Sequence, residues 1–274
     1  MADKRITPAR PDLAAAHLKG KVEAELFVEG EKFMSLRGHN PMRAAPDSHA
    51  EQQTELLCGE LFTVYEQKHG WAWGQIASDG YVGYVHILSL CPYVEATHRV
   101  RALATPLLTR PHIKAASNGV LPMNAVLRLG QACGDFFQTD AGYVSYRHLA
   151  PLHEFATDFV SVAERFLGAP YLWGGKTVAG LDCSGLIQTA LQAAGISAPR
   201  DTDMMEKALG VETGGADMQR GDLVFWKGHV GVMLDATRLL HANAFHMEVF
   251  AEPLDQAIAR IEKSGSAVTS VRRL

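Results

Sequence analysis

Up to about residue 150, the hydrophobic residues of the chain fall in short runs that alternate with polar residues. Residues 60–65 and 80–85 are two such runs, and Gly, Pro, Asn and Asp residues separate one run from the next. Short alternating runs with frequent turn residues are typical of small β-barrels. We therefore expect this part of the chain to consist mainly of β-strands.

The β-rich part contains an internal repeat. Residues 79–88 (DGYVGYVHIL) are echoed by residues 140–149 (DAGYVSYRHL), and Tyr81 aligns with Tyr143, 62 residues later. That period matches the size of a small barrel and exceeds the period of most solenoid repeats. The repeat therefore predicts two barrels in succession.

The hydrophobic period changes near residue 152. Phe159, Val162, Ala163 and Phe166 have the spacing of one buried helix face, and helix and strand patterns then alternate to the end of the chain. We expect a chain of α+β class with a domain boundary close to Pro151. The predicted parts are an N-terminal extension, a first small barrel, a second small barrel and a C-terminal domain, at residues 1–30, 31–92, 93–151 and 152–274.

Residues 182–195 carry the main chemical signal in the C-terminal domain. Cys183 begins a run whose apolar residues share one helical stripe, and Gly195 ends that run. A thiol in the first turn of a helix meets unpaired backbone N–H groups and the positive end of the helix dipole, and both lower its pKa. Cys183 is therefore predicted to be a nucleophile held as a thiolate.

A general base is predicted on a β-hairpin that follows. Residues 222–226 form its first strand, residues 227–228 form the turn, and His229 opens the second strand. His241 lies on a third predicted strand. On adjacent strands one histidine can take the thiol proton while the other orients and supports the imidazolium.

Taken together, these residues resemble the NlpC/P60 cysteine peptidases. The resemblance rests on four segments in order, residues 182–185 (DCSG), 220–226 (RGDLVFW), 229–232 (HVGV) and His241. The barrels before them resemble bacterial SH3 (SH3b) domains. The match looks closest to the γ-D-glutamyl-diamino acid endopeptidases that recycle murein peptides. It implies a papain-like domain in which Cys183, His229 and His241 are catalytic.

The resemblance also implies a substrate and the residues that bind it. The substrate would be a murein peptide with a free N-terminal L-Ala, cut after its γ-D-Glu, and no cofactor or metal is implied. In such enzymes acidic and hydroxyl side chains hold the substrate amine, and the first barrel contributes a wall of the cleft. The matching positions here are Asp182, Ser184, Asp201, Thr202, Tyr81 and Glu60.

Other interpretations of the same residues stay open. Cys183, His229 and His241 could hold zinc with one open position. Asp182 and Asp201 could cap helices, and Tyr81 could be a barrel-core aromatic. The whole domain could bind murein peptides without turnover, or it could transfer acyl or amide groups through the same thiol.

Composition narrows the partners and the compartment. The formal net charge of −4 and the lack of a long Lys/Arg run argue against binding to nucleic acid or anionic lipid. Four cysteines without a C-x-x-C pair suggest neither a zinc knuckle nor a disulfide framework, and three of them are expected to be small buried hydrophobes. Without an apolar signal core in residues 1–20 or a bilayer-spanning run, a cytoplasmic protein is expected. The oligomeric state and the diamino acid stay open.

Overall fold

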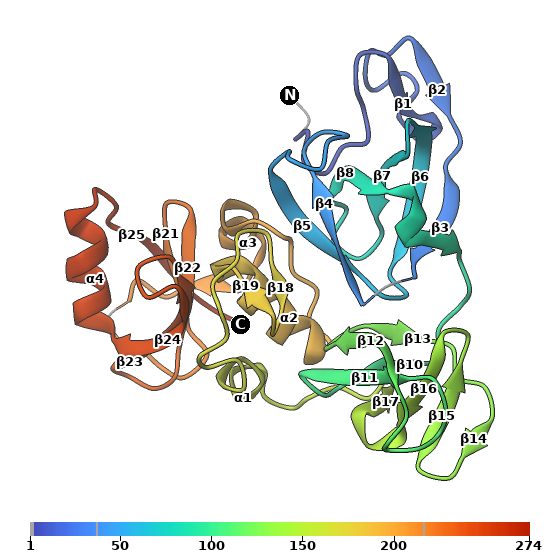
Figure 1. The fold of residues 1–274 in the computed structure, drawn as a ribbon. Helices are drawn as coiled ribbons and strands as arrows, with labels where there is room; N and C mark the ends of the chain where they lie inside the picture. The colour runs from blue at the N-terminus through green and yellow to red at the C-terminus, as the bar shows by residue number, and fades with distance from the viewer. Residues whose placement is uncertain (1–2, 37, 216) are drawn as a thin grey trace. The chain divides into compact units, whose positions relative to one another are not determined.

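The computed structural model describes residues 3–36, 38–215 and 217–274. The chain divides into two compact units, residues 1–152 and residues 153–274 (Figure 1). Both are mainly β-structure, with a few helices in the second unit. The observed division falls one residue after the boundary predicted from the change in hydrophobic period.

The first unit begins with a short parallel pair of strands and continues into a seven-stranded sheet of order β5-β4-β8-β7-β6-β3-β9. The sheet encloses a core that includes Met42, Leu56, Phe62 and Val85. The elements of this part are β1 (Leu13–Ala15), η1 (Ala16–Leu18), β2 (Leu26–Val28), β3 (Glu31–Ser35), β4 (His39–Arg43), β5 (Gln52–Leu57), β6 (Leu61–Lys68), β7 (Trp71–Ile76), β8 (Val82–His86), η2 (Ile87–Ser89) and β9 (Leu90–Pro92).

The N-terminal extension packs on this sheet. The guanidinium of Arg10 lies 4.4 Å from the ring centre of Trp73 and donates to the Tyr84 hydroxyl over 3.0 Å. Arg10 also forms an ion pair with Glu66 at 2.8 Å. These contacts hold the extension in place within the first unit.

The first unit continues with a second β part, which has a three-stranded sheet (β13-β10-β17) and a five-stranded sheet (β12-β11-β16-β15-β14). Its core includes Val100, Leu107, Leu121 and Val144. The elements are β10 (His98–Val100), β11 (Ala104–Leu108), β12 (Ser117–Pro122), β13 (Val126–Leu127), β14 (Ala132–Cys133), β15 (Phe136–Thr139), β16 (Gly142–Ser145), η3 (Tyr146–His148) and β17 (Leu149–Pro151).

The sequence repeat corresponds to a repeat in structure. In each copy a strand runs into one turn of 3-10 helix and then into a short strand, β8-η2-β9 in the first and β16-η3-β17 in the second. The predicted echo is therefore confirmed at the level of these elements.

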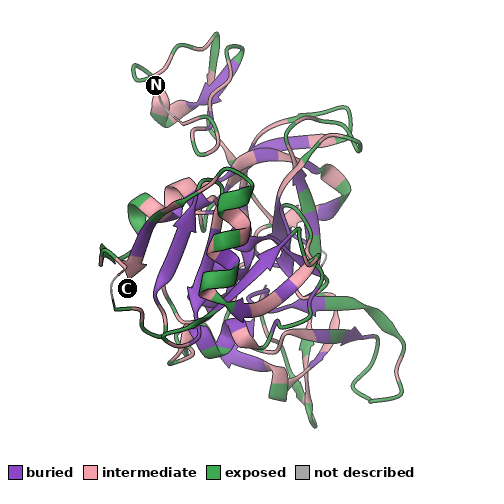
Figure 2. Ribbon diagram, turned by 90° about the vertical axis from the view of Figure 1, so that its left-hand side faces the viewer, coloured by how far each residue is buried: buried purple, intermediate pink, exposed green. Residues whose placement is uncertain are grey.

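The second unit is built around a six-stranded sheet of order β20-β25-β21-β22-β23-β24. Helix α4 covers one face of it through Ala257, Leu254 and Ile258, which pack with buried sheet residues such as Trp226. Figure 2 shows strands coloured as buried behind a helix whose outer residues are exposed. The elements are α1 (Phe159–Glu164), β18 (Lys176–Thr177), β19 (Gly180–Leu181), α2 (Cys183–Ala193), α3 (Thr202–Ala208), β20 (Val211–Glu212), β21 (Leu223–Trp226), β22 (His229–Met233), β23 (Arg238–Asn243), β24 (Glu248–Pro253), α4 (Leu254–Lys263) and β25 (Val268–Arg273).

Helix α2 and the β21-β22 hairpin confirm the elements predicted for the site. Gly195 follows the helix with a φ of 79°, and Gly228 has a φ of 75° in the hairpin turn. Residues other than glycine rarely adopt such positive φ angles. A Cβ atom on Gly185 would lie 2.0 Å from the Gly175 carbonyl oxygen. Glycine at position 185 therefore lets the first turn of α2 pack closely against the chain that precedes it.

All four cysteines are free thiols. Cys58 and Cys183 are buried, whereas Cys91 and Cys133 are partly exposed. The prediction of three buried structural cysteines is therefore right for Cys58 and wrong for Cys91 and Cys133, which lie on short strands where one side meets solvent. Within the described parts of the chain, no helix is long and apolar enough to cross a membrane.

Candidate active site

Cys183 is the first residue of α2, as the hydrophobic stripe predicted. Asp182 occupies the N-cap position, where its Oδ1 accepts a hydrogen bond of 2.6 Å from the Gly185 N–H. Such a cap satisfies one of the donors that a helix start leaves unpaired and so fixes where the helix begins. The cap therefore determines the position of the Cys183 side chain, which is buried with 7% of the residue's surface exposed.

A buried ion pair holds the cap itself. Arg200, which is 1% exposed, donates to both carboxylate oxygens of Asp182 over 3.0 and 2.7 Å. The Gly174 N–H donates to Oδ2 over 2.8 Å, and the Ser184 hydroxyl donates to Oδ1 over 3.1 Å. Ser184 in turn accepts from Arg200 over 2.7 Å.

These bonds give Asp182 and Ser184 a structural role. Asp182 caps α2 and pairs with a buried guanidinium, so the helix-cap alternative is confirmed. Ser184 belongs to the same buried network. Capping does not exclude contact with a substrate amine, and that contact stays a prediction for both residues.

His229 and His241 lie on the neighbouring strands β22 and β23, as predicted. The Nε2 atom of His229 is 2.8 Å from Nδ1 of His241, and the ring centres are 5.0 Å apart at an interplanar angle of 63°. The two rings therefore meet edge-on through a hydrogen bond. Since Nε2 of His229 is engaged, Nδ1 is the ring nitrogen through which His229 would act on the thiol.

The thiol lies against the segment that carries His229. The Cys183 thiol donates to the carbonyl oxygen of Gly228 across 4.0 Å, and a backbone hydrogen bond from Val230 also reaches the sulfur. Gly228 and Val230 flank His229 in the chain, so the sulfur lies against the backbone next to this histidine. The structure thus pairs His229 with His241 and places Cys183 beside the segment that carries His229.

Burial favours the neutral forms of both partners. Burial, and secondly the charge of Asp182, raise the pKa of Cys183 to about 12, although backbone N–H groups and Arg200 oppose the shift. Burial lowers the pKa of His229 to about 3. Burial therefore opposes the thiolate that the helix start predicts, because desolvation disfavours the charged sulfur. With both groups neutral, the thiol can pass its proton to His229 as it attacks a substrate.

Tyr171 is a site residue that the sequence analysis did not identify. Tyr171 forms a β-bridge with Leu181, the residue before the cap residue Asp182, and burial raises the pKa of its phenol to about 12. A neutral phenol beside a nucleophile can donate a hydrogen bond to charge that develops on the substrate. The available signal in the sequence was its position two residues before Trp173 and the glycine pair Gly174-Gly175, which lead to the helix that begins at Cys183.

Comparisons with known proteins agree with this site. The sequence model of the NlpC/P60 family matches residues 168–262, which include the thiol and both histidines. The "Gamma-D-glutamyl-L-lysine dipeptidyl-peptidase" of Bacillus subtilis is 30% identical over 223 residues, which cover 69% of this chain and 72% of that protein. The chain belongs to the NlpC/P60 family.

Two further relatives extend over most of the chain. The "Dipeptidyl-peptidase 6" of Lysinibacillus sphaericus is 27% identical over 238 residues, covering 78% of this chain and 88% of that protein. The crystal structure of a NlpC/P60 family protein from Bacillus cereus superimposes with a TM-score of 0.76 at 21% identity, covering 89% of this chain and 99% of that one. At that identity the likeness establishes the fold, which is papain-like in the NlpC/P60 domain.

The model of the bacterial dipeptidyl-peptidase SH3 domain matches residues 42–90. This confirms an SH3 domain in the first β part. The assignment of the second β part as another SH3 barrel, which rests on the sequence echo and on the shared order of elements, stays a prediction.

Two predicted substrate-binding residues lie in the first β part. Tyr81 is 3% exposed, belongs to the barrel core, and its hydroxyl donates to Gln53 Oε1 over 3.4 Å. Glu60 is buried and accepts hydrogen bonds from the Leu57 N–H (2.7 Å) and the Ser78 hydroxyl (3.0 Å). These contacts give both residues a role in the SH3 domain, and their contact with substrate stays a prediction.

The remaining predicted residues stand at the start of α3. Asp201 occupies the N-cap position, but its carboxylate makes no capping hydrogen bond, so the helix-cap alternative is wrong for this residue. Thr202 is buried in the first turn. The contact of Asp201 and Thr202 with the substrate amine stays a prediction.

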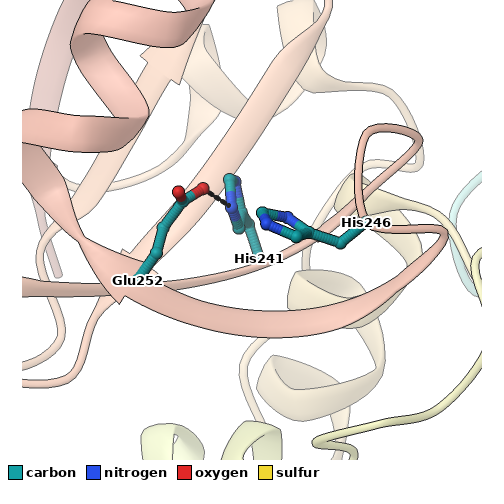
Figure 3. A group of neighbouring side chains, drawn as sticks. All are labelled: His241, His246 and Glu252. Carbon is teal, nitrogen blue, oxygen red and sulfur yellow. Dashed lines mark hydrogen bonds and ion pairs between the residues drawn. The ribbon is translucent and has the colours of Figure 1, made fainter.

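Metal-ligand side chains also gather beside the site. Among the described residues, possible ligand atoms of His241, His246 and Glu252 lie within 4.8 Å of one another (Figure 3). Both ring nitrogens of His241 are already hydrogen-bonded, to His229 and to Glu252, and Glu252 also pairs with Arg260. A cation here would have to displace a guanidinium, so we interpret this group as a hydrogen-bond network.

The buried ion pair leads to a prediction about stability. Replacing Arg200 with leucine should lower the free energy of unfolding by about 3–5 kcal/mol, because it leaves the Asp182 carboxylate buried without a partner. Urea unfolding measures the effect. The control is Arg238→Ala, which removes an exposed ion pair with Asp235 and should cost under about 1 kcal/mol. Equal effects of the two substitutions would contradict this account of the cap.

Proposed function

We propose that this protein is a cysteine peptidase that releases L-Ala-D-Glu from murein peptides, by cutting between γ-D-Glu and the diamino acid, in cell-wall peptide recycling. The observation that carries the proposal is the Cys183 thiol at the start of α2, set against the strand that bears His229, with His241 hydrogen-bonded behind it. This order of nucleophile, base and orienting group is the arrangement that nucleophilic catalysis requires.

The reaction follows from the protonation states. As the sulfur of Cys183 attacks the γ-carbonyl carbon of D-Glu, its proton moves to Nδ1 of His229, and the carbonyl oxygen becomes an oxyanion. Backbone N–H groups at the start of α2 and the Tyr171 hydroxyl are the donors we assign to that oxyanion. The C–N bond then breaks as His229 gives its proton to the leaving amine, and water hydrolyses the thioester with His229 again acting as base.

Three considerations support the substrate class. Two of the relatives are named dipeptidyl-peptidases, and one of these names specifies a γ-D-glutamyl-L-lysine bond. An enzyme that removes a dipeptide has to recognise a free amine two residues from the cut. An acidic side chain serves that purpose, and Asp182 and Asp201 are the candidates in the unit that holds Cys183.

A panel of synthetic peptides tests the proposal. L-Ala-γ-D-Glu-L-Lys and L-Ala-γ-D-Glu-diaminopimelate should each be cut after γ-D-Glu, with products identified by mass spectrometry. Acetylating the N-terminal amine should lower kcat/KM by about 100-fold or more, because the amine's charge-assisted contacts are worth about 3 kcal/mol. Equal cleavage of free and acetylated peptides would contradict the proposed specificity.

The same panel separates the two alternatives. A protein that only binds murein peptides would bind the free peptide by calorimetry and release no product. An acyl or amide transferase would leave the peptides intact and form an acyl-enzyme on Cys183 with an activated ester. The proposal also includes a cytoplasmic location, which cell fractionation with immunodetection tests.

A further inference from the structure

Behind the two histidines lies a buried carboxylate. Glu252, on β24, accepts a hydrogen bond of 2.8 Å from Nε2 of His241 through its Oε1 atom (Figure 3). Arg260, on α4, pairs with the same oxygen and lies over the ring of Phe245 at 4.6 Å. A continuous chain of contacts thus runs from α4 through β24 and β23 to His229 on β22.

The charges around Glu252 keep it ionised. Burial raises its pKa, but the hydrogen bonds from His241 and Arg260 outweigh burial, and the pKa is lowered. The charged or titratable groups that face this carboxylate and its histidine are Arg260 from α4, His229 from β22 and His246 from the loop before β24. An ionised carboxylate accepts hydrogen bonds and donates none.

This property dictates where the histidine protons sit. Because Glu252 can only accept, Nε2 of His241 must carry a proton, and Nδ1 of the neutral ring then has a lone pair. That lone pair can only accept, so Nε2 of His229 must carry a proton as well. Nδ1 of His229 is then unprotonated, which is the form that takes a proton from the thiol.

We infer that Glu252, held in place by Arg260, is a positioning residue that sets the tautomers of both active-site histidines so that His229 presents a basic Nδ1 atom to Cys183. The inference rests on the proposed roles of Cys183 and His229. A protonated or amide side chain at position 252 could donate to His241 Nε2, and the reversed bonds would put a proton on Nδ1 of His229. That form cannot act as the base.

The test observes the tautomers directly, without substrate. The full chain, labelled with ¹⁵N-histidine, is examined by long-range ¹H–¹⁵N correlation at pH 7, with His229→Gln and His241→Gln assigning the signals. The wild-type protein should show protonated Nε2 and unprotonated Nδ1 in both rings. In Glu252→Gln a second set of signals with protonated Nδ1 should appear. Protonated Nδ1 in the wild type, or unchanged signals in Glu252→Gln, would overturn the inference.

Kinetics supply the second readout. Glu252→Gln should lower kcat/KM by about 10- to 100-fold, the usual range for residues that orient a first-shell group. Glu248→Gln is the matched control on the same strand and should stay within about threefold. Arg260→Lys should retain most of the activity that Arg260→Gln loses, because the lysine keeps a positive charge beside Glu252. A loss in Glu252→Gln no greater than in Glu248→Gln would contradict the inference.

The two readouts distinguish this inference from the proposed function. If the histidines have the expected tautomers but the protein cuts no murein peptide, the role of Glu252 is upheld and the peptidase proposal is refuted. Peptide cleavage by a protein with the opposite tautomers would refute the role of Glu252 and leave the peptidase proposal standing.

Discussion

Replacing Cys183 with alanine should abolish peptide cleavage, with a fall in kcat of at least about 10⁴-fold. The substitution removes the sulfur that forms the thioester, while the oxyanion donors and the substrate-binding groups stay in place. Residual binding without turnover is therefore expected. Product formation is measured by mass spectrometry over long incubations, and binding is measured by calorimetry.

Two controls make this result interpretable. Thermal unfolding of the Cys183→Ala protein should resemble that of the wild type, since the substitution removes one atom from the first turn of a capped helix. Cys91→Ala, at a partly exposed thiol in the first unit, should retain full activity. Cleavage by the Cys183→Ala protein at more than about 1% of the wild-type rate would exclude this residue as the nucleophile.

Replacing His229 with glutamine should lower kcat/KM by about 10³-fold, the middle of the usual range for loss of a general base. The variant keeps a side chain that can hydrogen-bond to His241 but has no group that can take the thiol proton at neutral pH. His246→Gln, at a histidine that contacts Asn243 and stacks on Phe250, is the matched control and should stay within about tenfold.

The pH dependence of the wild type follows from the same residue. His229 is a base only above its pKa, and burial lowers that pKa to about 3. The profile of kcat/KM should therefore show no fall attributable to His229 as pH drops from 8 to about 5, because the imidazole stays neutral throughout. A fall centred near 6.5, the ordinary histidine value, would mean that His229 is solvated in the free enzyme.

The elements that carry the site were predictable because local sequence determines them. The stripe of apolar residues after Cys183 and the break at Gly195 define α2, and Gly228 defines the turn before His229. The order of these residues along the chain also carried the resemblance to the NlpC/P60 family. Such signals depend on residues close together in the chain, so an isolated sequence contains them.

The protonation states and the partners of the site were not predictable in this way. The prediction of a lowered pKa for Cys183 took account of the helix start but not of burial, which raises this pKa. Burial depends on how the β21-β22 hairpin packs against α2. The ion pair of Asp182 with Arg200 could not be predicted, because the two residues are 18 positions apart and nothing in the sequence pattern links them. Glu252 and Arg260 went unnoticed for the same reason, since only the pairing of β23 with β24 brings Glu252 to His241.

The acyl-enzyme is the most direct test of the account. L-Ala-γ-D-Glu-diaminopimelate is mixed with the wild-type enzyme, the reaction is stopped with acid within the first turnover, and the digested protein is analysed by mass spectrometry. We predict an L-Ala-γ-D-Glu adduct on the peptide that contains Cys183, absent from Cys183→Ala. An adduct on another residue would contradict the account. So would peptide cleavage that continues at the same rate after Cys183 has been alkylated.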